Sequence, residues 1–161
     1  MAPQAPSLGI VIVSYNTRQL TLDCLDSVWA ALAEEGLRAR VWVVDNASPD
    51  GSGQAIGQRY PAERYPALTL LCSEVNLGFA GGVNRALAQV AAEREPPEQV
   101  LLLNPDTLVR PGALTALSAF LQAHPQVGAV GAQLLYGDGS FQHGAFHFPT
   151  LAMILFDFWP L

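Results

Sequence analysis

The chain has 161 residues, of which half are hydrophobic and 14% are charged, so it is long enough for one domain with an ordinary core. Its formal net charge of −6, with only eight Lys and Arg residues, excludes a surface that grips nucleic acid through clustered basic side chains. An acidic chain that binds a phosphate-bearing ligand needs a metal ion, helix N-termini or a few placed arginines to offset repulsion.

Strand-like and helix-like segments alternate along most of the chain. Continuous apolar or β-branched runs predict four strands, at Leu8–Ser14, Arg40–Asp45, Ala67–Cys72 and Val100–Leu103. Helical periodicity and cap residues predict four helices, from Thr17 or Thr21 to Gly36, from the Ser48–Gly53 loop to Tyr60, over 83–93, and from Pro111 to His124. Two further strands around the Gly137–Ser140 turn, Val127–Tyr136 and Phe141–Phe148, predict a C-terminal β-hairpin.

This alternation implies right-handed parallel crossovers and therefore a doubly wound α/β sheet. We expect one domain over 8–149, preceded by a flexible N-terminus over 1–7 and followed by an apolar terminal segment over 150–161. Cys24 and Cys72 lie in apolar runs with no metal-ligand spacing around them, so both thiols are expected to be buried and reduced.

The two ends of the chain indicate where the protein works. The first seven residues lack the positive start and apolar core of a secretory signal, so a cytoplasmic location is the default expectation. The apolar end is shorter than the roughly 20 residues that a membrane-spanning helix requires. It could close the core, pack on a second copy as a homodimer or on sequence outside this chain, or lie on the inner face of a membrane.

Polar residues follow three of the predicted strands directly. Tyr15 and Asn16 follow the first strand, Asp45 and Asn46 end the second, and Asn104-Pro105-Asp106 follows the fourth. In a parallel sheet these loops open at one edge, which is where ligands of α/β proteins bind. Each position also has a purely structural interpretation. Asp45 could cap a turn, Tyr15 could pack in the core, and Asn-Pro-Asp could form a simple turn.

A glycine-rich segment, Asn76 to Arg85, precedes the third predicted helix. Gly78, Gly81 and Gly82 permit close approach of the backbone to an anion at a helix start. The spacing fits neither the P-loop nor the G-x-G-x-x-G pattern, so an ATPase or a classical dinucleotide fold has no support.

Five motifs in the same order resemble the inverting family 2 glycosyltransferases of the GT-A fold, in particular their rhamnosyltransferase-like bacterial members. They are IVIVSYN at Ile10–Asn16, VVDNASPDGS at Val43–Ser52, NLGFAGGVNRAL at Asn76–Leu87, LLLNPDT at Leu101–Thr107 and VGAVGAQLLYGDGS at Val127–Ser140. The resemblance implies a three-layer α/β/α domain with a mainly parallel sheet whose core strand order is 3-2-1-4. It also implies that the chain is the N-terminal, donor-binding portion of a larger enzyme.

The resemblance further implies a nucleotide-sugar site for a dTDP- or UDP-sugar. Asp45 would accept a hydrogen bond from the imide N–H of the pyrimidine, which uracil and thymine carry and cytosine lacks. Tyr15 would flank the base or sugar, and Asn16 and Asn46 would belong to the same site. In the glycine-rich segment Gly81, Gly82 and Asn84 would line the nucleotide, and Arg85 would meet the phosphates or simply begin a helix.

Most members of that family carry Asp-x-Asp where this chain has Asn104-Pro105-Asp106. The resemblance therefore makes Asp106 the ligand of a Mg²⁺ or Mn²⁺ ion, and gives Asn104 to a ribose or sugar hydroxyl. The general base of the family lies downstream, in an acidic motif that this chain does not contain, so we assign no catalytic residue and expect the base beyond Leu161.

The implied function is transfer of a sugar to a cell-surface glycan or a lipid-linked acceptor, without nucleic acid as a partner. One alternative is a sugar-nucleotide nucleotidyltransferase, which would be expected to carry a Gly-rich loop with Arg and Lys where Ser14–Thr17 lies. The other is a non-catalytic module that binds a nucleotide sugar, which the missing base leaves open.

Overall fold

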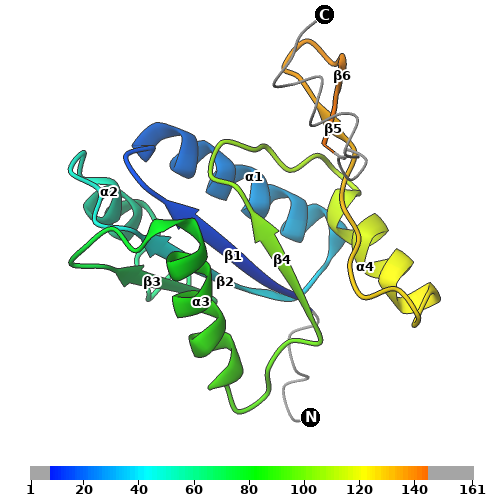
Figure 1. Cartoon of the computed structure of the whole chain (residues 1–161), viewed down its shortest axis with the longest axis horizontal. Helices are drawn as coiled ribbons and strands as arrows, with labels where there is room; N and C mark the ends of the chain where they lie inside the picture. Colours follow the sequence, from blue (N-terminus) through cyan, green and yellow to red (C-terminus); the bar gives the residue numbers. More distant parts are fainter. Residues whose placement is uncertain (1–7, 145–161) are drawn as a thin grey trace, which may run out of the picture.

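A parallel four-stranded sheet organises the computed structural model, which describes residues 8–144. The sheet has the order β3-β2-β1-β4, as predicted, so that β1 lies between β2 and β4 (Figure 1). The bounds of the strands are β1 Leu8–Ser14, β2 Ala39–Asp45, β3 Leu68–Cys72 and β4 Gln99–Leu103. Because all four strands run in one direction, their carboxyl ends meet at one edge.

Four helices connect the strands and cover both faces of the sheet. They are α1 Arg18–Glu35, α2 Ser52–Arg59, α3 Gly78–Ala91 and α4 Ala113–Ala123. Within residues 8–144, no helix is both long enough and apolar enough to cross a membrane.

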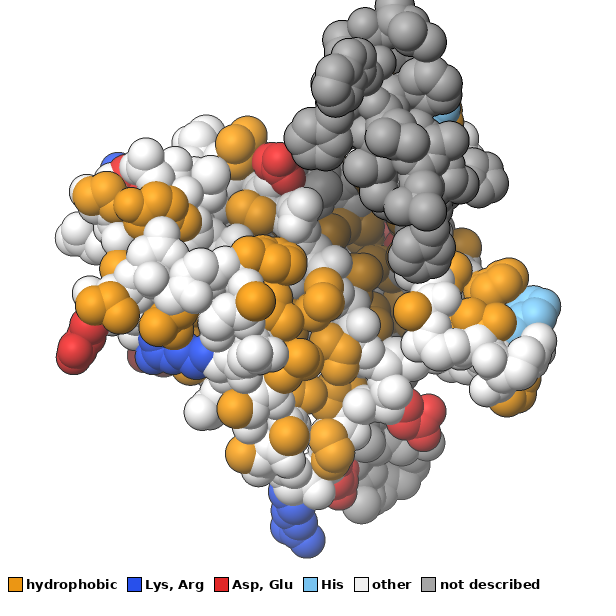
Figure 2. Space-filling view, in the orientation of Figure 1, with side chains coloured by type: hydrophobic (Ala, Val, Ile, Leu, Met, Phe, Trp, Pro, Cys, Tyr) orange, Lys and Arg blue, Asp and Glu red, His pale blue; other side chains and the backbone are white. Residues whose placement is uncertain are grey.

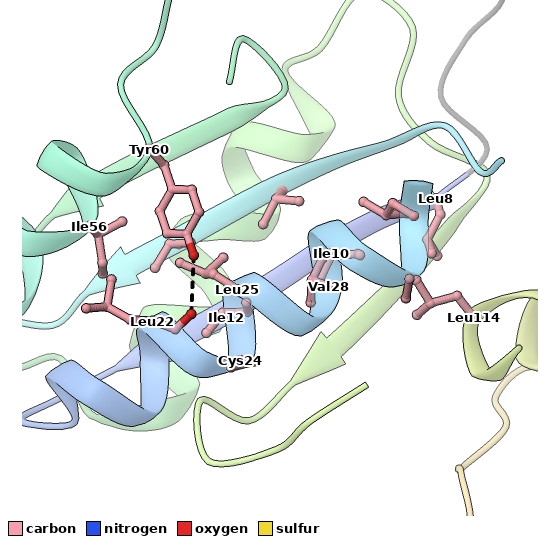
Figure 3. Packing of buried hydrophobic residues seen from close by; sticks show 14 of the residues in the cluster. Leu8, Ile10, Ile12, Leu22, Cys24, Leu25, Val28, Ile56, Tyr60 and Leu114 are labelled. Carbon is pink, nitrogen blue, oxygen red and sulfur yellow. Dashed lines mark hydrogen bonds between the residues drawn. The ribbon is translucent and has the colours of Figure 1, made fainter. Parts of the chain in front are cut away.

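The larger core lies between the sheet and three helices. Alternate side chains of β1 and β2, such as Ile10 and Val43, are fully buried against α1, α2 and α4 (Figure 3). The Tyr60 hydroxyl at the end of α2 lies within hydrogen-bond distance of two acceptors on α1, the Leu22 carbonyl at 3.2 Å and Asp26 Oδ1 at 2.7 Å. The buried hydroxyl of Tyr60 therefore has hydrogen-bond acceptors on α1, and these contacts hold α2 against α1.

The opposite face of the sheet has a smaller core under α3. Val11, Trp42 and Val44 pack there against Ala86 and Val90, which completes the predicted three layers. The helix does not reach β4, whose Val100 and Leu102 side chains are 39% and 49% exposed. Figure 2 shows hydrophobic side chains gathered between α3 and α4, where β4 runs.

Two predicted elements differ in extent from those observed. Helix α3 begins at Gly78, five residues before the expected start, so Gly81 and Gly82 lie inside it. The hairpin is present but short, with β5 Leu134–Leu135 antiparallel to β6 Phe141–Gln142. The glycines and alanines of 127–133 form no strand, because these residues offer little side-chain packing to a sheet. The end of the second predicted strand, 145–148, and the segments 1–7 and 150–161 lie outside the described residues.

Candidate nucleotide-sugar site at the carboxyl edge of the sheet

The predicted polar loops meet at the carboxyl edge of the sheet. Ser14, the last residue of β1, is aligned with Asp45 of β2, and Ile12 is aligned with Leu103 of β4. Neighbouring strands are about 4.8 Å apart, so the ends of β2 and β4 are separated by roughly 10 Å with β1 between them. Asp45 and the 104–106 turn therefore lie at the same edge of the sheet, within reach of one elongated ligand.

Asp45 has a closely fitted position at the end of β2. Its side chain is 7% exposed, and its Oδ1 atom accepts the Ser48 backbone N–H at 3.3 Å. A Cβ atom built on Gly53, in the first turn of α2, would lie 2.6 Å from Asp45 Oδ2. The carboxylate thus caps the turn after β2, as the alternative reading predicted, and only glycine at position 53 leaves room for it.

The loop after β1 is tied to the loop after β2. Asn16 adopts a left-handed conformation with φ of 56°, and its backbone N–H donates to Ser48 Oγ at 2.9 Å. Tyr15 is 49% exposed, so its ring is free to meet a ligand instead of filling the core. The two loops are therefore linked, and together they form a surface on which the Tyr15 side chain is exposed.

Asp50 joins the starts of two helices, a role that was not predicted from the sequence. Its Oδ2 atom accepts the Arg18 N–H of α1 at 3.0 Å, and its Oδ1 atom accepts the Ser52 N–H of α2 at 3.0 Å. The Ser52 hydroxyl, together with these N–H groups, holds the pKa of Asp50 below its ordinary value.

Thr17, which was predicted to cap α1, occupies the N-cap position, but its side chain makes no capping hydrogen bond. The Asp-Gly-Ser sequence was the available signal, since Asp before a helix start favours such a turn.

The glycines of the Asn76–Arg85 segment serve packing within α3. Gly82 is buried, and a Cβ atom there would lie 2.7 Å from Val13 Cγ1 of β1. A Cβ atom on Gly81 would lie 2.8 Å from Leu77 Cβ. Both glycines therefore allow the first turns of α3 to approach the sheet and the preceding loop closely.

Asn84 and Arg85 lie one turn further along α3. Asn84 is exposed, while the half-buried Arg85 donates to Ser73 Oγ and, at 2.9 Å, to the Cys72 carbonyl. No carboxylate of residues 8–144 forms an ion pair with Arg85. The end of β3 thus orients the guanidinium, and its remaining N–H groups can donate to an anion.

Helix α1 contacts the Asn104-Pro105-Asp106 turn through Cys24. The Asn104 carbonyl accepts the Thr107 hydroxyl at 2.7 Å and the Cys24 thiol at 3.6 Å. Burial raises the pKa of Cys24 to about 11, and the negative charge of Asp106 acts in the same direction. Asn104 and Asp106 are exposed, and within the described part of the chain no group hydrogen-bonds the Asp106 carboxylate.

The oxygen atoms of this turn fit a hard divalent cation that is completed by other ligands. No cluster of three or more His, Cys, Asp or Glu side chains in residues 8–144 could hold a metal by itself. Mg²⁺ commonly binds through one or two carboxylates together with substrate phosphates and water. A single exposed carboxylate, Asp106, that accepts no hydrogen bond from residues 8–144 fits that mode of binding.

Comparison with known proteins agrees with this architecture. The N-acetylglucosaminyl-diphospho-decaprenol L-rhamnosyltransferase of Mycobacterium tuberculosis is 36% identical over 131 residues, covering 74% of this chain and 41% of that protein. This chain therefore spans about two fifths of the length of those curated relatives.

Solved glycosyltransferase structures are similar to the described domain. The mannosyltransferase PcManGT from Pyrobaculum calidifontis, in complex with GDP-Man and Mn²⁺, superposes with a TM-score of 0.63 at 29% identity, over 78% of this chain and 34% of that one. S. aureus TarS 1-349 in complex with UDP gives a TM-score of 0.56 at 27% identity, over 74% and 33% of the two chains.

The family model for glycosyl transferase family 2 matches residues 9–157, which is nearly the whole chain. That match includes every loop described above. The protein belongs to glycosyl transferase family 2, and its described domain has the GT-A fold.

Proposed function

We propose that these residues bind the nucleoside diphosphate sugar donor of an inverting glycosyltransferase, with a divalent metal ion. The observation that carries the proposal is the placement of Asp45 and Asp106 at one edge of a parallel sheet, two strands apart, in a family 2 chain. The base would lie at the end of β2 and the diphosphate at the end of β4.

Asp45 is proposed to select a pyrimidine with an imide N–H. Its Oδ1 atom accepts the Ser48 N–H, and Oδ2, which accepts no hydrogen bond from residues 8–144, would accept the donor of the ligand. An ionised carboxylate accepts a hydrogen bond from uracil or thymine but meets only an acceptor at the same position of cytosine. Tyr15 would pack against the base, and Asn16 and Asn46 would belong to the surrounding loops.

The diphosphate is proposed to lie between α3 and the 104–106 turn. Asp106 would hold a Mg²⁺ or Mn²⁺ ion there, and a bound ion would supply Lewis-acid stabilisation of charge on the departing diphosphate. Arg85 would donate to a phosphate oxygen, and Asn104 to a ribose or sugar hydroxyl. The backbone at Gly81 and Gly82 and the exposed Asn84 side chain would line this part of the site.

The acceptor is proposed by likeness to the Mycobacterium tuberculosis relative, whose name describes a rhamnosyltransferase that acts on a decaprenyl diphosphate. A dTDP-sugar is then the first candidate donor, and a lipid-linked glycan at the inner face of a membrane the first candidate acceptor. The general base that takes the proton of the acceptor hydroxyl would come from sequence beyond Leu161.

Isothermal titration of the chain with UDP, dTDP and CDP, each with and without Mn²⁺, tests the donor site. We expect UDP and dTDP to bind about tenfold more tightly than CDP, because CDP leaves the Asp45 carboxylate without a donor. We also expect Mn²⁺ to strengthen binding of both. Equal affinity for CDP would contradict the role of Asp45, and no binding of any nucleotide would contradict the donor site.

The family assignment favours this function over a nucleotidyltransferase, whose expected Gly-rich basic loop is replaced by the Tyr15–Thr17 loop. A non-catalytic binding module predicts the same titration result but no transfer of sugar to any acceptor.

A further inference from the structure

The Asn46 side chain is directed toward the loop between β3 and α3. It is 2% exposed, and its Nδ2 atom donates to Asn76 Oδ1 at 2.8 Å and to the Gly78 carbonyl at 3.1 Å. Its Oδ1 atom accepts the Leu77 N–H at 2.9 Å. Asn76 Oδ1 also accepts the Gly78 N–H at 2.8 Å. We call these four hydrogen bonds the Asn46–Asn76 clasp.

The amide of Asn46 has almost no capacity left for a ligand. Both of its N–H groups and one of its two acceptor sites are used within the clasp. Its orientation is fixed because Leu77 N–H can only donate and the Gly78 carbonyl can only accept. A buried and saturated amide positions its neighbours and does not contact substrate.

The segment held by the clasp has few other constraints. Every residue from Glu74 to Ala80 is exposed, so burial of side chains does not fix its path. Gly78, the first residue of α3, adopts a left-handed conformation with φ of 69°. The hydrogen bonds from Asn46 and Asn76 therefore determine where α3 begins.

Adjacent residues at the end of β2 thus fix two different loops. Asp45 packs on the first turn of α2, whereas Asn46, on the other face of the strand, holds the first turn of α3. The geometry points to Asn46 and Asn76 as positioning residues that set the affinity of the donor site by holding the start of α3 beside Asp45. This inference rests on the donor site proposed above.

The test is a double-mutant cycle of Asn46→Ala and Asn76→Ala, with UDP affinity in the presence of Mn²⁺ as the measurement. We expect each single variant to bind UDP about tenfold more weakly, because misplacement of a binding element by about 1 Å is costly. The double variant should bind no more than about twofold more weakly than either single variant, because both substitutions break one unit. Two residues that contacted UDP independently would instead give losses that multiply.

Tyr60→Phe is the control for a general loss of stability. It removes a hydroxyl within hydrogen-bond distance of the Leu22 carbonyl and of Asp26, at 3.2 and 2.7 Å, and keeps the buried ring. We expect this variant to unfold at lower urea concentration and to bind UDP like the wild type. If Asn46→Ala does not fold, the exposed Asn76→Ala and the isosteric Asn46→Asp, which loses both Nδ2 donors, complete the test.

Wild-type affinity in the folded Asn46 and Asn76 variants would overturn the positioning role, as would losses that multiply in the double variant. If the wild-type chain itself binds no UDP, the proposed donor site fails instead. The wild-type titration therefore separates the two failures.

Discussion

Gly53→Ala is expected to weaken UDP binding by at least about tenfold. The new Cβ atom would lie 2.6 Å from Asp45 Oδ2 and 3.1 Å from Cys72 Sγ, so one of these groups must move. The first turn of α2 is fixed by Asp50, which binds both the N–H and the hydroxyl of Ser52. The Asp45 carboxylate is therefore displaced, and with it the proposed acceptor for the pyrimidine N–H. Overpacking of this kind should also lower the free energy of unfolding by about 1–3 kcal/mol.

Gly57→Ala is the matched control on the same helix. A Cβ atom at this exposed position would meet only Leu70 Cδ2, at an ordinary contact distance of 3.8 Å. Alanine favours a helix over glycine by up to about 1 kcal/mol, so this variant should be slightly more stable and should bind UDP normally. Isothermal titration and urea unfolding measure both effects. Wild-type UDP affinity in Gly53→Ala would show that the Asp45 carboxylate is not part of the site.

Asp106→Ala is expected to abolish the gain in UDP affinity that Mn²⁺ provides. The side chain is exposed and forms no hydrogen bond within 8–144, so its removal should hardly change the free energy of unfolding. Loss of the carboxylate leaves no other acidic side chain on the turn after β4 to hold the ion. Binding of UDP in the absence of metal should be close to that of the wild type.

The control for charge is Asp23→Ala, which removes one carboxylate from an exposed position on α1. Asp23 accepts a hydrogen bond from Gln19 and has no place in the proposed site. The Asp23→Ala variant should keep the full gain in UDP affinity that Mn²⁺ provides, as measured by isothermal titration. An unchanged metal effect in Asp106→Ala would exclude this residue as the ligand.

The sheet was predictable because its signals are local. Continuous apolar runs such as Leu8–Ser14 occur mainly in strands buried on both faces, and alternation with helices requires parallel crossovers. The positions of Asp45 and Asp106 at one edge follow directly from that topology. The family resemblance supplied the strand order, which the structure confirms.

The remaining features depend on contacts between residues far apart in the sequence. Helix α3 starts at Gly78 because Asn46, 32 residues earlier, bonds the Gly78 carbonyl. The cap of α1 comes from Asp50, also 32 residues away, instead of from Thr17. Cys72 was expected to be buried but lies exposed at the end of β3, whereas Cys24 is buried as predicted. No periodicity of hydrophobic residues encodes such contacts.

The most direct test of the donor site is an anomalous difference map from crystals of the chain grown with dTDP and Mn²⁺. We predict one manganese peak beside the Asp106 carboxylate, in contact with the diphosphate, and the thymine imide nitrogen within hydrogen-bond distance of Asp45. A nucleotide bound away from the ends of β2 and β4, or manganese without contact to Asp106, would contradict the proposed site.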